Sequence, residues 1–248
     1  MAEVIVFEAG GYRYIKGGFQ FSSGVAAQPG FEMERARLHK PLPLAEGFAA
    51  VEAHLKSIGR PGTAFAACEL RSSQPFTEQG FIDFNRQYVV TLERWGLYRN
   101  EVNPVARTNV CPEFNKPAVP SLYAFSYTVP AAATRRGTFV IAGGAERRNP
   151  NAVSAAVRAG DISLDAMREK LRFVFGTMEE RLNALGFGMN DAANTRAYTV
   201  HDIGALIGQE IAARGAAEGG LTWHFARPPV VGLEFEMDVR ATAREILL

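Results

Sequence analysis

The order of the expected secondary-structure elements repeats once along this chain of 248 residues. Apolar residues at helical spacing predict helices, and alternating or β-branched runs between turn residues predict strands. The expected helices span 42–58, 81–95, 164–185 and 203–213. The expected strands span 19–23, 63–71, 105–110 and 121–128 in the first half, and 138–142, 194–201, 221–226 and 233–240 in the second. Each half therefore reads strand, long helix, strand, second helix, strand, strand, which predicts an internal duplication.

Two copies of this element order predict an α+β protein of two tandem modules, each a mixed sheet with two helices on one face. The Pro- and Ala-rich stretch 129–137 is the natural boundary, so the modules are expected at 1–130 and 131–248. The helix over 164–185 is the most regular one. We expect Ser163 to cap its first turn and Gly186 to end it.

The sheet face that carries no helices needs a cover of its own. The positions expected to point that way include several aromatic residues: Phe19, Phe21, Tyr123, Phe125 and Tyr127. Burying them against other copies of the chain predicts a symmetric oligomer. The last strand alternates apolar residues with Glu234, Glu236, Asp238 and Arg240, which is typical of a strand with one wet face. The basic cluster Arg35, Arg37 and Lys40 is interpreted as a solvated loop.

Composition excludes several classes of function. The 27 basic and 26 acidic residues leave a net charge of +1, which argues against a protein that holds nucleic acid by bulk charge. Two cysteines predict no disulfide framework, and no membrane span or signal peptide is recognisable, so we expect a cytoplasmic protein. The four histidines show no ligand spacing, and no phosphate-binding glycine loop occurs. We therefore expect neither a metal nor a cofactor.

Five segments carry a resemblance to a known family: FQFSSGV (19–25), NPVARTNV (103–110), SLYAFSYT (121–128), TFVIAGGAE (138–146) and GGLTWHFARPPVVGLEFEMDV (219–239). In this order they resemble the Rid/YjgF family, whose members deaminate reactive enamines and imines. The second half is similar to a Rid module along nearly its full length, and the first half more loosely. The resemblance implies chorismate-mutase-like α+β modules and a homotrimer with sites at the module interfaces.

The resemblance also implies site residues. Arg107 occupies the place of the family arginine that clamps the substrate carboxylate, and a guanidinium is chemically suited to this because its planar fork binds a carboxylate in two places. Asn109, the next residue on the same face of that strand, would orient a nitrogen or a water molecule. The backbone at Ser23 and Gly24 matches a second carboxylate contact, where a glycine allows close approach.

Neither half retains both the arginine and the glutamate of the family. The glutamate position falls on Glu234 in the second half and on Tyr123 in the first, while Gly220 stands where the second arginine would be. Two explanations stay open. In the first, one cleft combines Arg107 with groups of the second half such as Glu234, Trp223 or His224. In the second, the first half alone is active, with Tyr123 in place of the glutamate.

In its tandem form the chain resembles deaminases of 2-aminomuconate and 2-amino-5-chloromuconate type. The predicted function is hydrolytic release of ammonia from such an enamine or imine dicarboxylate, by Arg107, Asn109, Tyr123 and Glu234, without a cofactor. The second carboxylate would need a further clamp, for which Arg13, Lys16 and Arg136 are candidates. The alternative is a non-catalytic module that binds small carboxylates or other proteins. A ribonuclease is disfavoured by the neutral charge and the lack of a basic aromatic stripe.

Overall fold

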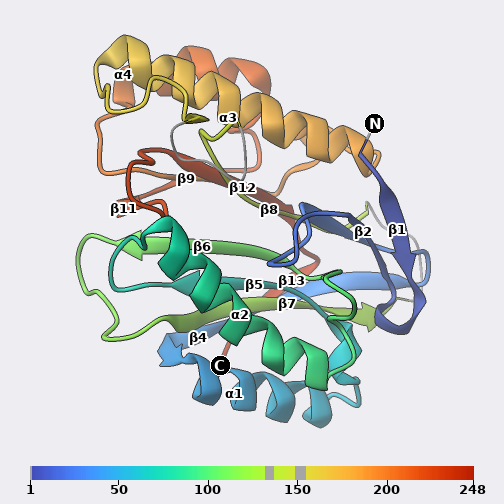
Figure 1. The fold of residues 1–248 in the computed structure, drawn as a ribbon. Coiled ribbons are helices and arrows are strands. Elements are labelled where there is room, and N and C mark those ends of the chain that lie inside the picture. Colours follow the sequence, from blue (N-terminus) through green and yellow to red (C-terminus); the bar gives the residue numbers. More distant parts are fainter. Residues whose placement is uncertain (1, 132–136, 149–154) are drawn as a thin grey trace.

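The computed structural model describes residues 2–131, 137–148 and 155–248, which form two β-sheets with helices outside both (Figure 1). The strands are β1 Val4–Phe7, β2 Tyr12–Ile15, β3 Gly24–Ala27, β4 Phe31–Pro43, β5 Phe65–Arg71, β6 Ala106–Pro112, β7 Ser121–Pro130, β8 Phe139–Ala145, β9 Asn194–Tyr198, β10 Leu221–His224, β11 Ala226–Arg227, β12 Glu236–Ala241 and β13 Arg244–Leu247. The helices are α1 Leu44–Ser57, α2 Glu78–Arg94, α3 Leu164–Ala184 and the single turn α4 Gly204–Leu206. The six-stranded sheet has the order β11-β6-β5-β7-β4-β13, and the seven-stranded sheet the order β1-β2-β3-β8-β12-β9-β10.

The same strand order occurs in both sheets. Four neighbouring strands run β4-β7-β5-β6 in one sheet and β8-β12-β9-β10 in the other. In each set the last two strands pair in parallel and the other neighbours pair antiparallel. The long helix follows the first strand of each set. The α+β class and the internal duplication predicted from the sequence are therefore confirmed.

The two sheets exchange strands between the halves of the chain. The N-terminal strands β1 to β3 join the seven-stranded sheet, where Gly24 pairs with Ile141. The C-terminal strand β13 pairs in parallel with β4, and the two-residue strand β11 extends the other edge of the same sheet. The division between the two sheets therefore does not coincide with the expected module boundary. Residues 132–136 of that boundary lie outside the described residues. The division into 1–130 and 131–248 stays a prediction about the modules.

Two expected elements are corrected. The strand expected at 19–23 is wrong, because these residues connect β2 to β3 and β4 opens the first repeat. The charged residues of β4 hide it in the sequence: Arg35 lies on this strand and is 4% exposed, so it is no loop residue. The helix expected at 203–213 consists of α4, a π-helical turn and a 3₁₀ turn. Gly204 and Gly208 lower the helix propensity of this stretch.

Each helical layer has its own apolar core. On the six-stranded sheet, α1 and α2 bury residues such as Phe48 and Leu92. On the seven-stranded sheet, α3 buries a stripe that includes Leu171 and Met178. Side chains cap α2 and α3: Thr77 accepts from Gly80 N–H at 3.0 Å, and Ser163 accepts from Ala166 N–H at 3.3 Å. Gly186 lies just beyond α3 at φ +81°, so the predicted start and end of this helix are confirmed.

The helix-free faces of the two sheets cover one another, with α3 above them and α1 and α2 below (Figure 1). Phe125 and Tyr127 point instead into the core under α1 and α2 and are fully buried within one chain. They give no reason for a second copy, and the homotrimer stays a prediction. The polar residues of β12 are buried between the sheets, so the expected wet face of this strand is wrong.

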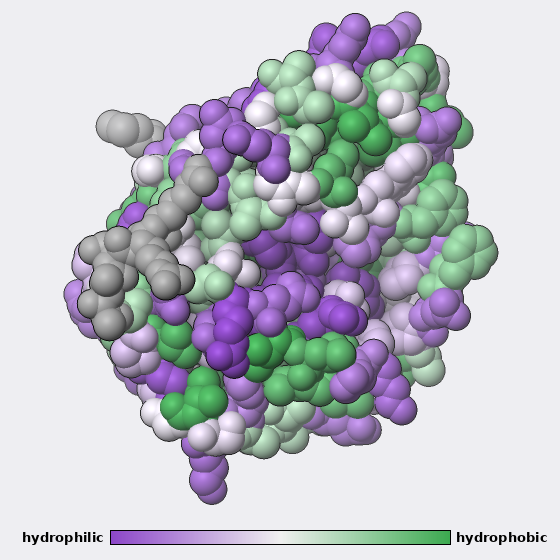
Figure 2. All heavy atoms as spheres, turned by 180° about the vertical axis from the view of Figure 1, so that it is seen from behind, coloured by the Kyte–Doolittle hydropathy of each residue, from purple (hydrophilic) through white to green (hydrophobic). Residues whose placement is uncertain are grey.

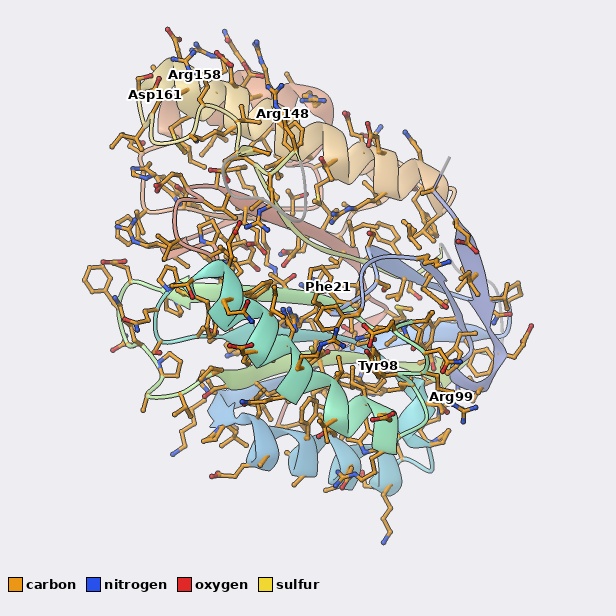
Figure 3. All side chains as sticks on the ribbon, viewed as in Figure 1. Phe21, Tyr98, Arg99, Arg148, Arg158 and Asp161 are labelled. Carbon is orange, nitrogen blue, oxygen red and sulfur yellow. The ribbon has the colours of Figure 1, made fainter. Side chains whose placement is uncertain are left out.

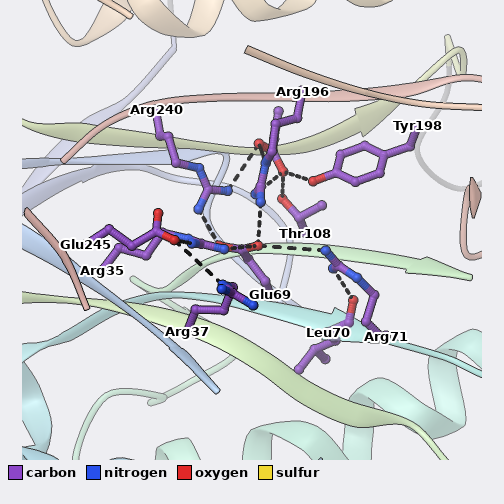
Figure 4. A network of polar contacts seen from close by, with 11 residues as sticks. Arg35, Arg37, Glu69, Leu70, Arg71, Thr108, Arg196, Tyr198, Arg240 and Glu245 are labelled. Carbon is purple, nitrogen blue, oxygen red and sulfur yellow. Dashed lines mark hydrogen bonds and ion pairs between the residues drawn. The ribbon is translucent and has the colours of Figure 1, made fainter. Parts of the chain in front are cut away.

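The layer between the sheets holds a network of ion pairs centred on Glu69 and Asp238 (Figure 4). Glu69 accepts two hydrogen bonds from Arg35, at 2.6 and 3.0 Å, and one from Arg196 at 2.6 Å. Asp238 is bound by Arg196 and Arg240 and also accepts from Thr108 Oγ1 at 2.7 Å and from Tyr198. On the rear face of the molecule, hydrophilic side chains gather in a hollow at mid-height (Figure 2). The two halves are thus joined by charge as well as by apolar contact.

Glu69→Gln is expected to lower the free energy of unfolding by about 3–5 kcal/mol, because it leaves buried arginines without their shared carboxylate. Burial alone would raise the pKa of Glu69, but Arg196 and Arg35 hold it well below its ordinary value. Its contribution is therefore present above the pKa of an unfolded glutamate and is lost as the pH falls toward the lowered pKa. Urea denaturation at neutral and acid pH measures both effects. The exposed pair of Glu52 with Arg94 is the control, and Glu52→Gln should change stability by less than about 1 kcal/mol; equal losses in both variants would contradict the assignment.

Candidate active site

Arg107 is a buried cation whose terminal nitrogens have no polar partner among the described residues. It lies on β6, opposite Cys68 of β5, and is 2% exposed. Its guanidinium carbon is 4.6 Å from the ring centre of Tyr88 and 4.8 Å from that of Phe21, which is labelled in Figure 3. Phe81 and Phe84 complete the aromatic walls at 5.6 and 5.7 Å.

Both terminal nitrogens of Arg107 are buried and make no hydrogen bond in the described structure. Burial lowers the pKa of Arg107, because the apolar walls disfavour its charge. A buried charge is stable only when an opposite charge and hydrogen bonds compensate it. The geometry therefore calls for a planar anion, and a carboxylate matches the two parallel N–H groups.

Glu236 is the carboxyl group brought to this site by the other half of the chain. It lies on β12 and is 4% exposed. A Cβ at Gly143 would overlap Oε1 of Glu236 and would lie 3.1 Å from Cγ2 of Thr108, the residue after Arg107. The glycine of β8 therefore makes room for the carboxyl group between β8 and β6. Arg107 and Glu236 come from opposite halves of the chain and influence each other's pKa through their charges.

The surroundings of Glu236 favour its protonated form. Burial raises its pKa well above the ordinary value, and the charges of Asp238 and Glu146 raise it further. Arg107 and Arg181 oppose this shift without cancelling it. No hydrogen bond fixes the carboxyl group among the described residues. A buried carboxyl group with a raised pKa can act as a proton donor and, once ionised, as a proton acceptor.

Glu146 and Lys170 hold the segment that leads into β12. Both residues are fully buried, and Lys170 Nζ lies 3.4 Å from Oε1 of Glu146. The Glu146 carboxylate accepts from the backbone N–H of Glu234 at 2.7 Å and from that of Phe235 at 3.1 Å. Lys170 also donates to the carbonyl oxygen of Val157 at 2.7 Å. These contacts fix the start of β12 and therefore the position of Glu236, its first residue.

Among the residues predicted from the sequence, Asn109 accompanies Arg107. It lies two residues further along β6 and is 3% exposed. Its Oδ1 accepts from Ser72 Oγ at 3.0 Å, while its Nδ2 has no partner in the described structure. The backbone of Ser23 is engaged elsewhere, because its N–H donates to the carbonyl oxygen of Ile15 at 3.0 Å. Gly24 is paired with strands on both sides. The carboxylate contact at these two residues stays a prediction.

The other predicted residues are not gathered at Arg107. Tyr123 stacks on the guanidinium of Arg71 at 4.1 Å, and β5 separates its strand from β6. Glu234 precedes β12, and its carboxylate lies 2.7 Å from Nε2 of His201. Trp223 donates to the carbonyl oxygen of Thr199, and His224 stacks on the ring of Tyr198.

Of the residues predicted to bind the second carboxylate, Arg13 donates to two backbone carbonyl oxygens and Lys16 pairs with Glu3, while Arg136 lies outside the described residues.

Within residues 2–131, 137–148 and 155–248, no group of three His, Cys, Asp or Glu side chains is placed to hold a metal ion. In the same ranges, no helix is both long and apolar enough to span a membrane.

The sequence analysis missed Glu236 and the pair formed by Glu146 and Lys170. Glu236 stands two residues after Glu234 in the same alternating run, so the pattern offered both carboxylates. The fold defines a tandem α+β protein, and the buried guanidinium of Arg107 marks its candidate carboxylate-binding site.

Comparisons with known proteins name the family. A family model described as "2-aminomuconate deaminase CnbZ" matches residues 4–246, and the chain belongs to this family. The "2-amino-5-chloromuconate deaminase" of Comamonas testosteroni is 57% identical over 251 residues, covering 100% of both chains. A chorismatase crystal structure matches with 12% identity and a TM-score of 0.52, over 89% of this chain and 77% of its own, and shares the fold. A RidA structure from the Antarctic bacterium Psychrobacter sp. PAMC 21119 matches 46% of this chain and 93% of its own, with 16% identity and a TM-score of 0.33.

Proposed function

We propose that this chain is a hydrolytic deaminase of a 2-aminomuconate-type acid, and that its single composite site joins Arg107 to Glu236. The observation that carries the proposal is the buried guanidinium of Arg107, whose terminal nitrogens make no hydrogen bond in the described structure and whose charge acts on Glu236, a carboxyl group of raised pKa. The family description and the name of the 57% identical relative support the substrate class. The proposal also includes two more specific statements: that water releases the ammonia, and that the protein acts in the degradation of aromatic compounds.

The chemistry needs one clamp, one proton carrier and one water molecule. Arg107 binds the carboxylate on C1 and thereby fixes C2, the carbon that carries the amino group. Protonation of the diene carbon turns the enamine into an iminium ion. Water then adds to C2, and the resulting carbinolamine expels ammonia, leaving a 2-oxo acid. The sum is enamine acid plus water giving 2-oxo acid plus ammonia.

Glu236 is placed to move the protons of this sequence. In its protonated form it donates to the diene, and as a carboxylate it accepts a proton from the attacking water. It returns that proton to the departing nitrogen and then accepts the hydroxyl proton of the carbinolamine as the carbonyl forms, so the residue ends the cycle protonated, as it began. The aromatic walls of Phe21, Phe81 and Tyr88 limit the water around Arg107 and strengthen its attraction for the carboxylate.

The test is ammonia release from freshly generated 2-aminomuconate in ¹⁸O-labelled water. The proposal predicts one ammonia per 2-oxo acid formed, with the label in the oxygen at C2. A parallel assay with 2-aminoacrylate measures how far the enzyme prefers the longer diacid. Binding of muconate without ammonia from any enamine acid would refute the deaminase and favour a carboxylate-binding module.

A further inference from the structure

Unsatisfied polar atoms are concentrated around Arg107. In the described structure, twelve buried side-chain nitrogen or oxygen atoms lack a hydrogen-bond partner. Six of them belong to Ser22, Asn85, Arg107 and Asn109. In Asn85 both amide atoms, Oδ1 and Nδ2, are unsatisfied although the residue is fully buried. The proposed mechanism so far uses the guanidinium alone and leaves this amide unexplained.

Asn85 belongs to the helix face on which the guanidinium of Arg107 lies. Side chains three and four residues apart are neighbours on a helix, so positions 81, 84, 85 and 88 of α2 form one four-cornered patch. Three corners, Phe81, Phe84 and Tyr88, have ring centres within 5.7 Å of the guanidinium carbon. Asn85 is the fourth corner. Its side chain therefore lies on the same face of α2 as the three rings that surround the guanidinium.

An amide with no partner for either atom lowers stability, because burial removes its water and nothing replaces it. A leucine would fill a similar volume at this core position without that loss. Buried polar groups in native proteins are nearly always satisfied, so the exceptions call for a ligand or a water molecule. The site next to Asn85 supplies the ligand.

We propose that Asn85 is a substrate-binding residue that recognises the substituent on C2, an inference that rests on the proposed function. With the carboxylate on Arg107, the next atom outward is C2 with its nitrogen. The N–H of an enamine donates to Oδ1, and the oxygen that replaces the nitrogen in the product accepts from Nδ2. An aspartate in this place would only accept, whereas the amide serves substrate and product alike.

The test uses two stable diacids as probes, muconate, which has no substituent on C2, and 2-hydroxymuconate, which carries an oxygen there. Calorimetry should show that the wild-type protein binds 2-hydroxymuconate about tenfold more tightly than muconate. In Asn85→Leu this preference should vanish, while the Kd for muconate stays within about twofold. The melting temperature should be unchanged or higher, a result that a merely structural asparagine would not give. Gln87→Leu, an exposed position on the same helix, is the matched control and should keep the preference.

A preference retained in Asn85→Leu, or a preference lost together with a lower melting temperature, would overturn the inference. Equal weakening of both diacids would also overturn it, because the amide would then bind the carboxylate. Asn85→Met, an unbranched replacement, repeats the test if leucine does not pack. Failure of the proposed function looks different: the wild-type protein would bind neither diacid, or Arg107→Met would still bind both.

Discussion

Arg107→Met is expected to lower kcat/KM by roughly 100- to 3,000-fold, the equivalent of about 3–5 kcal/mol for removing one partner of a buried charge pair. The same change should raise the melting temperature of the unliganded protein. Methionine keeps apolar volume among the rings of Tyr88 and Phe21 and removes a buried charge that has no partner. Steady-state kinetics and calorimetry on one preparation measure both effects. Lost activity with gained stability is typical of a binding residue.

Two further variants control for charge and for substitution as such. Arg107→Lys keeps the charge without the two-pronged donor and should restore only a small part of the activity. Arg99→Met, at an exposed position labelled in Figure 3, should change stability by about 0.5 kcal/mol or less and leave turnover unaffected. Full activity in Arg107→Met would remove this residue from the mechanism. A large loss of stability would show instead that the guanidinium is part of the core.

Glu236→Gln is expected to lower kcat by roughly 10²- to 10⁴-fold with a much smaller change in KM, because glutamine fills the same space but carries no proton to transfer. Glu234→Gln is the informative comparison two residues earlier. Its carboxylate is already paired with His201, so the loss there should stay below about tenfold. Rapid mixing with 2-aminomuconate separates the chemical step from binding. A larger loss at Glu234 than at Glu236 would reverse the assignment.

The raised pKa of Glu236 gives the same variant a second signature. The folded wild-type protein binds this proton more tightly than the unfolded chain, so its stability falls as the pH rises from the ordinary glutamate pKa through the raised one. Glu236→Gln lacks this fall and should be the more stable protein at alkaline pH. Melting temperatures over a pH series test the sign. Parallel curves for both proteins would contradict the raised pKa.

The sequence predicted the long helices, the strand repeat and Arg107 because each of these leaves a local pattern. Helix α3 shows its apolar stripe together with a cap at Ser163 and a stop at Gly186. Strand β4 could not be found in this way, since its inward residues include Arg35, which is buried because Glu69 pairs with it from a distant part of the chain. In β12, the alternation of apolar and charged residues indicated a face exposed to solvent, but this face is covered by the other sheet.

The position of Glu236 could not be derived from the sequence for the same reason. Glu234 and Glu236 differ in sequence by one alternation step, but only Glu236 lies within β12 and next to Gly143. The choice depends on where the strand begins, which the pair Glu146 and Lys170 decides through two backbone hydrogen bonds. The proposed site follows the first of the two explanations drawn from the sequence, a site that combines both halves, with Glu236 in place of Glu234.

The most direct test of this composite site is a crystal structure of Glu236→Gln with 2-aminomuconate or 2-hydroxymuconate bound. The account predicts a carboxylate held in two places by Arg107 of the first half, with C2 facing residue 236 of the second half within hydrogen-bond distance. A ligand bound entirely within one half, with the guanidinium of Arg107 still unpaired, would contradict it.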